Sequence, residues 1–399
     1  MQTVVFSSRN RLPVVLIQFP SIAALIRLRK TLFLFLLVTA ASLVGCARLR
    51  HEQTEMVYVS ARKAYLRDRV AAVSNRTGEV QNGDALVVLE HGRRFMRVRT
   101  PKNETGWIQE QMVIDAKTHD AFDELASAHK DDPPAATATL RDDLYMHITP
   151  GRDTDRFYLL AGESKVQLLQ RASVTKTPTP GAVPAPAKPA TAAPGAKSGA
   201  TAAPAAKPEL PPAYEDWWLA RDSQGHIGWL LGGRVDVDVP DAIAVYGEGQ
   251  RFIGTWPIST INDPGSDAPN HEVPQYIALM APNKSGLSFD FDQVRVFTWS
   301  KGHHRYETGF RLKPIQGFLP VKVYTTETKQ GTVPAFSFQI ASNDDVTTDP
   351  ATGIVRPAAP RTVEYAVIDT MVKRIGADTA PIPIKRDPTQ AKKPAAKKR

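Results

Sequence analysis

The chain has 399 residues, enough for two or three domains, and it contains 32 prolines but only one cysteine. Its formal net charge is +9, from 50 lysines and arginines against 41 aspartates and glutamates. Residues 1–45 carry +5 and residues 385–399 carry +6, which leaves −2 for residues 46–384. Because the body is nearly neutral, the charge excludes a generally basic nucleic-acid-binding protein, and we expect no nucleic acid partner. A single cysteine also excludes an internal disulfide and a cysteine-based zinc site.

The amino-terminal segment has the layout of a secretory signal. A positive block at residues 27–30 precedes an apolar run at residues 31–43, and small residues follow. The run is shorter than the roughly 20 apolar residues of a membrane-spanning helix. We therefore expect export, with residues 1–45 as the signal peptide.

The four residues Leu-Val-Gly-Cys at 43–46 resemble the bacterial lipobox. The resemblance implies diacylglycerol on the Cys46 sulfur, cleavage before this residue and acylation of the new amine. Several acyl chains give stable attachment, because each buried methylene contributes about 0.8 kcal/mol. The residue after the cysteine is Ala47 and not aspartate, which in lipoproteins implies the inner face of the outer membrane, on the periplasmic side. The alternative is a chance cysteine at the end of an uncleaved anchor.

Residues 54–115 read as a small β-barrel. Turn signals separate five short strand-like segments, at residues 56–59, 64–67, 85–89, 95–99 and 106–108. An early Leu-Arg strand, a Gly-Asp turn before an apolar strand and a late Gly-Trp-Ile strand resemble the bacterial SH3-like domain. The resemblance implies an SH3-like barrel over the whole segment.

A helix expected at residues 119–132 leads to a second copy of this pattern at residues 137–236. An Ala/Pro-rich tract at residues 174–212 interrupts the copy. The strand at 217–221 corresponds to that at 95–99, and Gly-Trp at 228–229 corresponds to Gly-Trp at 106–107. The tract therefore replaces a turn inside the second barrel, and we expect it to be disordered.

Residues 239–384 contain about eight strand-like segments separated by loops rich in Pro, Asn and Asp. This pattern favours a β-rich, sandwich-like domain of no family that we identify. The basic tail at residues 385–399 has the composition of a disordered segment. The predicted fold class is therefore all-β, with two tandem SH3-like barrels before the sandwich.

We find no catalytic motif, and we expect no cofactor and no metal. No phosphate-binding loop is present. The residues from His303 to Glu307 form the richest titratable cluster, which we interpret as the solvated end of a hairpin. Asp290, Asp292 and the Asn-Asp-Asp run at 343–345 lack the ligand spacing of an EF-hand loop, so we interpret them as solvated turns and not as a calcium site.

The aromatic residues of the two copies are the better recognition candidates. Trp107 and Trp229 follow glycine at equivalent positions, and the alternative is that they belong to the core. Two adjacent tryptophans at 217–218 face opposite sides of their strand, so we expect one in the core and the other exposed. The predicted ligand-binding residues are Tyr65, Trp107, Tyr145, Trp217, Trp218 and Trp229.

Three functions remain open. The first is a membrane-anchored, non-enzymatic binding or scaffolding protein for peptidoglycan or a periplasmic protein, which the SH3-like resemblance favours. The second is an envelope enzyme with its catalytic site in residues 239–384 and the barrels as targeting units. The third is a structural subunit of an envelope assembly.

Overall fold

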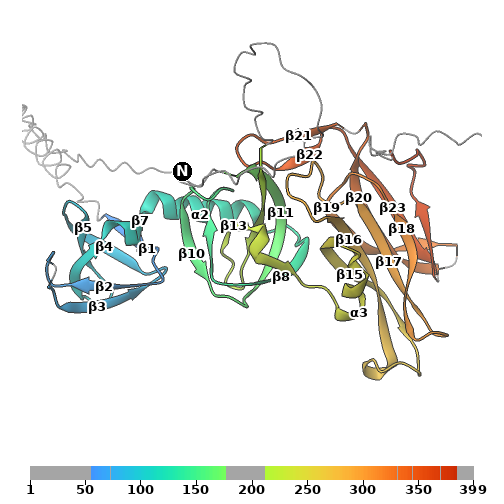
Figure 1. The fold of residues 1–399 in the computed structure, drawn as a ribbon, viewed down its shortest axis with the longest axis horizontal. Helices are drawn as coiled ribbons and strands as arrows, with labels where there is room; N and C mark the ends of the chain where they lie inside the picture. The colour runs from blue at the N-terminus through green and yellow to red at the C-terminus, as the bar shows by residue number, and fades with distance from the viewer. Residues whose placement is uncertain are drawn as a thin grey trace, which may run out of the picture. The chain divides into compact units, whose positions relative to one another are not determined.

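The computed structural model describes residues 55–383, except residues 72, 177–211, 330, 344 and 369. Cys46 with its signal segment, most of the Ala/Pro tract and the tail at 385–399 lie outside the described residues, so the predictions made for them stay predictions. The described part consists mostly of antiparallel sheets (Figure 1), which confirms the all-β fold class. Within this part, no helix has the length and apolar character needed to cross a membrane.

The first sheet, which we call repeat 1, has seven strands in the order β3-β2-β6-β5-β4-β1-β7. Alternate side chains point to one side and form a hydrophobic core of the repeat's own, which includes Val57, Leu66, Leu86, Val98 and Ile108. The elements are β1 (Met56–Val59), β2 (Lys63–Arg67), β3 (Arg76–Gln81), β4 (Ala85–His91), β5 (Phe95–Arg99), β6 (Thr105–Gln109), the short helix η1 (Glu110–Met112) and β7 (Val113–Asp115).

The second sheet, repeat 2, has the same order strand for strand, β10-β9-β13-β12-β11-β8-β14. Even a register shift is repeated, between Val88 and Glu90 in β4 and between Leu168 and Gln170 in β11. The elements are β8 (Ala136–Leu140), β9 (Leu144–His147), β10 (Arg156–Leu160), β11 (Lys165–Thr175), β12 (Tyr214–Arg221), β13 (Ile227–Leu231), η2 (Gly232–Arg234) and β14 (Val235–Val237).

The glycine of each Gly-Trp pair is required by a close approach of two strands. A Cβ on Gly106 would lie 2.7 Å from the Cβ of Leu66, and a Cβ on Gly228 would lie 2.6 Å from the Cβ of Met146. Both distances are shorter than real Cβ contacts allow, so only glycine lets β6 lie against β2 and β13 lie against β9.

Neither repeat closes into a barrel through hydrogen bonds among the described residues. The edge strands β3 and β7 of repeat 1 pair only with β2 and β1, and repeat 2 has the same open order. The expectation of closed barrels is therefore not met, and the SH3-like assignment stays a prediction. The sequence pattern also missed β3 and β7, because β3 is a mostly exposed edge strand and β7 has only three residues.

Helix α2 (Ala116–His129) follows β7 directly and starts three residues before the expected position. The reason is a helix cap: the Asp115 carboxylate accepts a hydrogen bond of 2.8 Å from the backbone N–H of Thr118. The helix ends beside repeat 2, where its side chains take part in the packing described below.

The carboxyl-terminal part contains two four-stranded antiparallel sheets, β15-β16-β17-β18 and β19-β20-β23-β24, and a two-stranded sheet, β21-β22. The facing sides of the two four-stranded sheets share a core of aliphatic and aromatic side chains, as in a sandwich, and this core continues into repeat 2. The elements are α3 (Asp241–Ala244), η3 (Val245–Gly247), β15 (Gln250–Asn262), η4 (Pro269–His271), β16 (Glu272–Pro282), β17 (Gln293–Ser300), β18 (Arg305–Leu312), β19 (Gly317–Thr328), β20 (Gly331–Ala341), β21 (Val346–Thr348), β22 (Val355–Pro357), β23 (Pro360–Ile368) and β24 (Met371–Ile375).

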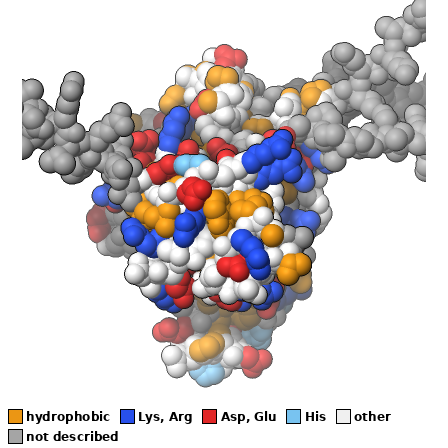
Figure 2. Space-filling view, turned by 90° about the vertical axis from the view of Figure 1, so that its left-hand side faces the viewer, with side chains coloured by type: hydrophobic (Ala, Val, Ile, Leu, Met, Phe, Trp, Pro, Cys, Tyr) orange, Lys and Arg blue, Asp and Glu red, His pale blue; other side chains and the backbone are white. Residues whose placement is uncertain are grey.

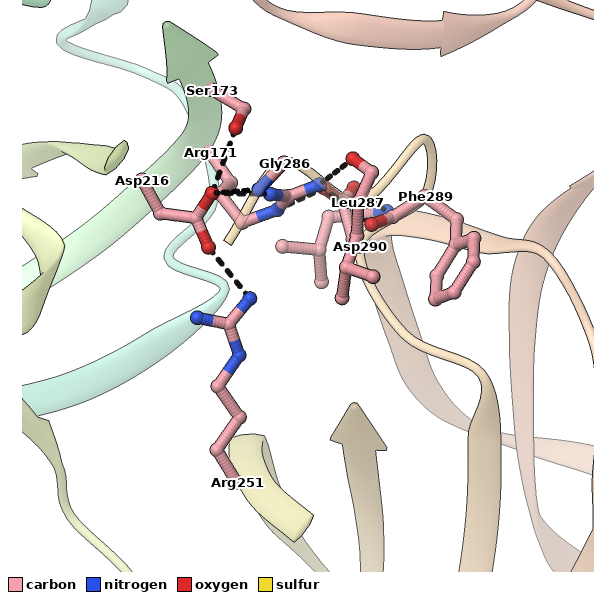
Figure 3. A network of polar contacts seen from close by, with 9 residues as sticks. Arg171, Ser173, Asp216, Arg251, Gly286, Leu287, Phe289 and Asp290 are labelled. Atoms are coloured by element: carbon pink, nitrogen blue, oxygen red, sulfur yellow. Dashed lines mark hydrogen bonds and ion pairs between the residues drawn. The ribbon is translucent and has the colours of Figure 1, made fainter. Parts of the chain in front are cut away.

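A buried ion network joins repeat 2 to the sandwich (Figure 3). The Arg171 guanidinium of β11 donates to Asp216 of β12 and to Asp290 of the sandwich, each at 3.1 Å, while its side chain is 1% exposed. It also donates to the carbonyl oxygens of Leu287 and Phe289. Asp216 in turn accepts from Arg251 of β15 at 2.7 Å. Each buried charge therefore has a partner of opposite charge from another segment.

We predict that Arg171→Ala destabilises the protein by about 3–5 kcal/mol, because it leaves two buried carboxylates without their shared cation. Urea unfolding of the full chain measures this difference. The matched control is Arg141→Ala, which removes an exposed two-bond pair with Asp236 and should cost no more than about 1 kcal/mol. Equal losses in the two variants would contradict the structural role of the network.

We also predict that the Ala/Pro tract can be removed without loss of the fold. Thr175 pairs with Tyr214, and the Lys176 N–H donates to the Ala213 carbonyl at 2.7 Å, so the two sides already meet as in a hairpin. Replacing residues 177–212 by Asn-Gly should keep a single unfolding transition and raise the stability by up to about 2 kcal/mol, because loop closure becomes easier. A second transition in calorimetry, or an unfolded variant, would contradict the prediction.

Candidate functional site

Repeat 1 has a side that faces away from its core, which we call the outward face. The burial of β2, β5 and β6 alternates, so that every second side chain leaves the core. The side chains on the outward face are Tyr65 and Arg67 of β2, Phe95, Arg97 and Arg99 of β5, and Trp107 of β6. In the view of Figure 2, hydrophobic side chains gather among Lys and Arg, with Asp and Glu interspersed.

One row of this face runs across four strands. Arg67 of β2 is in register with Trp107, Trp107 with Arg97, and Arg97 with Glu90 of β4. Trp107 is half-buried and is therefore available on one side, while Arg97 is exposed. Cross-strand neighbours in register lie about 5 Å apart, so the tryptophan stands between two arginines.

Tyr65 lies on the same face beneath a cation. The Arg76 guanidinium stacks over the Tyr65 ring at 3.9 Å from its centroid, and in repeat 2 Arg156 stacks over Tyr145 at 4.6 Å. Both predicted tyrosines are thus half-buried and already hold an arginine of their own repeat. They lie at the edge of the outward face, next to β3 in repeat 1 and next to β10 in repeat 2.

The equivalent row of repeat 2 is mostly buried. It consists of the buried His147, Trp229 and Leu219 and the half-buried Gln170, in the same register as the row of repeat 1. Trp229 is 3% exposed and Leu219 is fully buried. Burial lowers the pKa of His147, and the nearby charge of Arg156 lowers it further, so this position favours a neutral imidazole.

The chain itself covers the outward face of repeat 2. Leu125 and Ala126 of helix α2 and Ile354 of the loop before β22 pack against the buried cluster of Leu169, Ala172, Trp217, Leu219, Ile227 and Trp229. The Arg221 guanidinium donates to the carbonyl oxygen of His129, at the end of the helix, at 2.6 Å, and to that of Asp132 at 3.2 Å. An arginine near a helix C-terminus satisfies carbonyls that have no partner within the helix.

The prediction that one of Trp217 and Trp218 is exposed is wrong. The two side chains do face opposite sides of β12, but they are 2% and 5% exposed. Trp218 belongs to the core that repeat 2 shares with the sandwich, and Trp217 lies under α2 and Ile354. Because each side of this sheet is covered by another part of the chain, Trp217, Trp218 and Trp229 are packing residues here.

The polar groups of the sandwich have structural partners. His303 lies at the exposed turn between β17 and β18, as the hairpin interpretation expected, and its Nδ1 lies 2.8 Å from a carboxylate oxygen of Glu307 in β18. Asp290 and Asp292 are not in solvated turns, because both are buried: Asp290 accepts from Arg171, and Asp292 accepts from Gln250 at 3.1 Å. Burial raises the pKa of Asp290, which the Arg171 charge counteracts.

His119, Asp120 and Asp123 of α2 form a further titratable group, which the sequence analysis did not single out. Their possible ligand atoms lie within 4.8 Å of one another, and both carboxylates are exposed. The His119 ring stacks on Tyr58 of repeat 1 at 3.7 Å between centroids. Exposed acidic groups of this kind are common on helices, so the outward face remains the stronger candidate.

The sequence analysis also missed the arginines of the outward face. Arg99 pairs with Val87 and Thr105, as Arg221 pairs with Gln167 and Ile227, so the two arginines occupy the same position of the repeat. The alignment of the two copies contains this signal, since the segment 95–99 was matched to 217–221. The role of this arginine position becomes clear only from the structure, in which Arg221 binds the end of the helix that packs on repeat 2.

We predict different costs for the two equivalent tryptophans. Trp229→Ala should destabilise the protein by about 3–5 kcal/mol because it empties a buried site, whereas Trp107→Ala should cost about 1–2 kcal/mol because much of that side chain is already in water. Denaturant unfolding of both variants checks this. A loss for Trp107→Ala as large as that for Trp229→Ala would show that Trp107 is a core residue and not part of an open face.

No protein-family model matches the chain, and no curated protein matches it. Among solved structures, the chain is similar to NlpC2 from Trichomonas vaginalis, with 10% identity and a TM-score of 0.14 over 48% of this chain and 52% of that chain. It is also similar to an NlpC/P60 family protein from Bacillus cereus ATCC 10987, with 9% identity and a TM-score of 0.20 over 49% and 62%. The chain thus covers less than two thirds of either structure, and TM-scores this low carry no argument about its fold or function.

Proposed function

We propose that this chain is a lipid-anchored binding protein of a bacterial cell envelope, tethered through Cys46 on the periplasmic side and binding its partner through the outward face of repeat 1. The partner is peptidoglycan or a periplasmic protein. The observation that carries the proposal is the difference between the two repeats: in repeat 2 the face is covered by α2 and Ile354, whereas in repeat 1 only the repeat's own turn at Gly92 approaches Trp107, and no described segment from outside the repeat packs on the face.

The side chains of the open face suit recognition better than catalysis. Trp107 and Phe95 offer rigid apolar surface, and Arg97 and Arg99 offer donors for carboxylates and carbonyls, whereas Arg67 already donates to the Ser74 hydroxyl at 3.0 Å. Among the described residues, this face carries no histidine or cysteine beside its arginines. The face therefore has the composition of a binding site with apolar anchors and a cationic rim.

We predict that Cys46→Ser releases the protein from membranes or leaves the signal segment uncleaved, because acyl chains on this residue are the proposed anchor. Membrane fractionation and mass spectrometry of the purified protein measure both effects. Ala47→Ser is the matched control and should stay lipidated. A mature, membrane-bound chain with an unmodified Cys46 would contradict the anchoring part of the proposal.

The binding part is tested by placing a photo-crosslinking residue at position 107 in the full chain inside cells. We expect an adduct with peptidoglycan or with a discrete envelope protein, because Trp107 lies at the centre of the open face. The control is the same residue at Val245, which is 79% exposed on the sandwich side of the chain. Equal labelling from both positions, or no adduct from position 107 together with no sedimentation of the protein with purified sacculi, would contradict the proposal.

A further inference from the structure

We infer that the outward face of repeat 1 binds an acidic amphipathic α-helix of a partner protein, in the arrangement in which repeat 2 holds α2. The inference rests on the proposed function, because it names the partner class of the same face. Repeat 2 provides the template for this arrangement within the chain itself.

Helix recognition by repeat 2 has two parts. The apolar part is the contact of Leu125 and Ala126 with the buried cluster around Trp229. The polar part is Arg221, whose guanidinium reaches the carbonyl oxygen of His129 at the C-terminal end of the helix. The apolar contacts therefore hold the side of the helix against the face, and the arginine at the helix end determines its position along the helix axis.

Repeat 1 retains both parts without a helix. Trp107 takes the place of Trp229, and Arg99 takes the place of Arg221. Arg99 is exposed, and its guanidinium makes no hydrogen bond or ion pair with any residue that the structure describes, although its backbone pairs with Val87 and Thr105. The guanidinium that binds the C-terminal end of α2 in repeat 2 thus has an equivalent in repeat 1, and that equivalent has no side-chain partner.

The side chains that differ determine the charge of the helix. Leu219 of repeat 2 corresponds to Arg97, and the buried His147 corresponds to Arg67. Two arginines on either side of Trp107 favour a helix with carboxylates flanking its apolar stripe. Glu90 is the one acid of this row, and it already lies 3.9 Å from Arg97.

The segments of the chain outside the described residues do not have this chemistry. Residues 1–54 contain seven lysines and arginines and one acid, and residues 177–211 contain three lysines and one acid. The terminal residues 384–399 are also strongly basic. All three segments carry the same sign of charge as the face, so charge complementarity favours another molecule as the occupant.

The probe for the test is a fluorescent, acetylated and amidated peptide of residues 115–130, the sequence of α2, with Lys117→Glu. The change gives the peptide a net charge of −4, and the peptide ends beside the His129 carbonyl that Arg221 binds in repeat 2. Fluorescence anisotropy with the full chain in detergent should show saturable binding. Arg99→Ala and Arg97→Ala should each weaken it about tenfold, as should a peptide with Asn and Gln in place of its acids. Binding should also weaken with added salt.

The matched control is Arg69→Ala, which removes an exposed arginine of repeat 1 that lies outside the strands of the row and should leave the affinity within about twofold. Thermal melting of each variant establishes that it is folded. Absence of saturable binding, or binding that is insensitive to Arg97→Ala and Arg99→Ala, overturns the helix inference. If the peptide fails but position 107 still crosslinks in cells or purified sacculi still capture the protein, the proposed function stands with a different partner. If all of these fail, the proposed function fails as well.

Discussion

The arrangement of repeat 2 and the sandwich depends on the pairing of Arg171 with Asp216 and Asp290 in a buried site. Moving such charges out of water costs several kcal/mol each, and their mutual attraction offsets this only when the geometry satisfies most of their hydrogen bonds. Here the donors of one guanidinium meet two carboxylates and two carbonyl oxygens, and Asp216 also accepts from Ser173 and Arg251. The network therefore favours one placement of the loop at 286–290 against β11 over others that would leave a charge unpaired.

The packing of repeat 2 against the sandwich explains why the two copies of the repeat differ in their cores. Repeat 1 has a core of its own, whereas the core of repeat 2 is continuous with that of the sandwich. The side chains of repeat 2 follow from this: Trp218 fills the shared core on one side, and Trp217, Leu219 and Trp229 are covered on the other. Repeat 1 has Arg97, Thr105 and Gln109 at the positions of Leu219, Ile227 and Leu231 in repeat 2, as expected for a surface in contact with water.

In the proposed function, the covered copy of the duplicated sheet has a structural role and the open copy binds the partner. In repeat 2 the outward face stabilises the chain by holding α2, and its arginine satisfies carbonyls of that helix. In repeat 1 the same framework, including the glycine before the tryptophan and the register shift in β4, presents Trp107 between arginines. The proposed function and the helix inference both rest on this difference, and neither requires a titratable catalytic group or a cofactor.

The sequence by itself determined the all-β class, the duplication and the equivalence of the two Gly-Trp pairs at Trp107 and Trp229. These features depend on side-chain alternation along single strands and on spacings that repeat within the chain, which are local properties. Only the tertiary structure decided that Trp217 and Trp218 are both buried, that Asp290 is an internal ion-pair partner, and that Arg99 is the unpaired counterpart of Arg221. Each of these outcomes depends on which distant segment covers one side of a sheet: α2 and Ile354 over Trp217, and the loop at 286–290 beside Arg171. The alternation of side chains along a strand predicts which side of the sheet a residue faces. It does not predict which other part of the chain packs on that side.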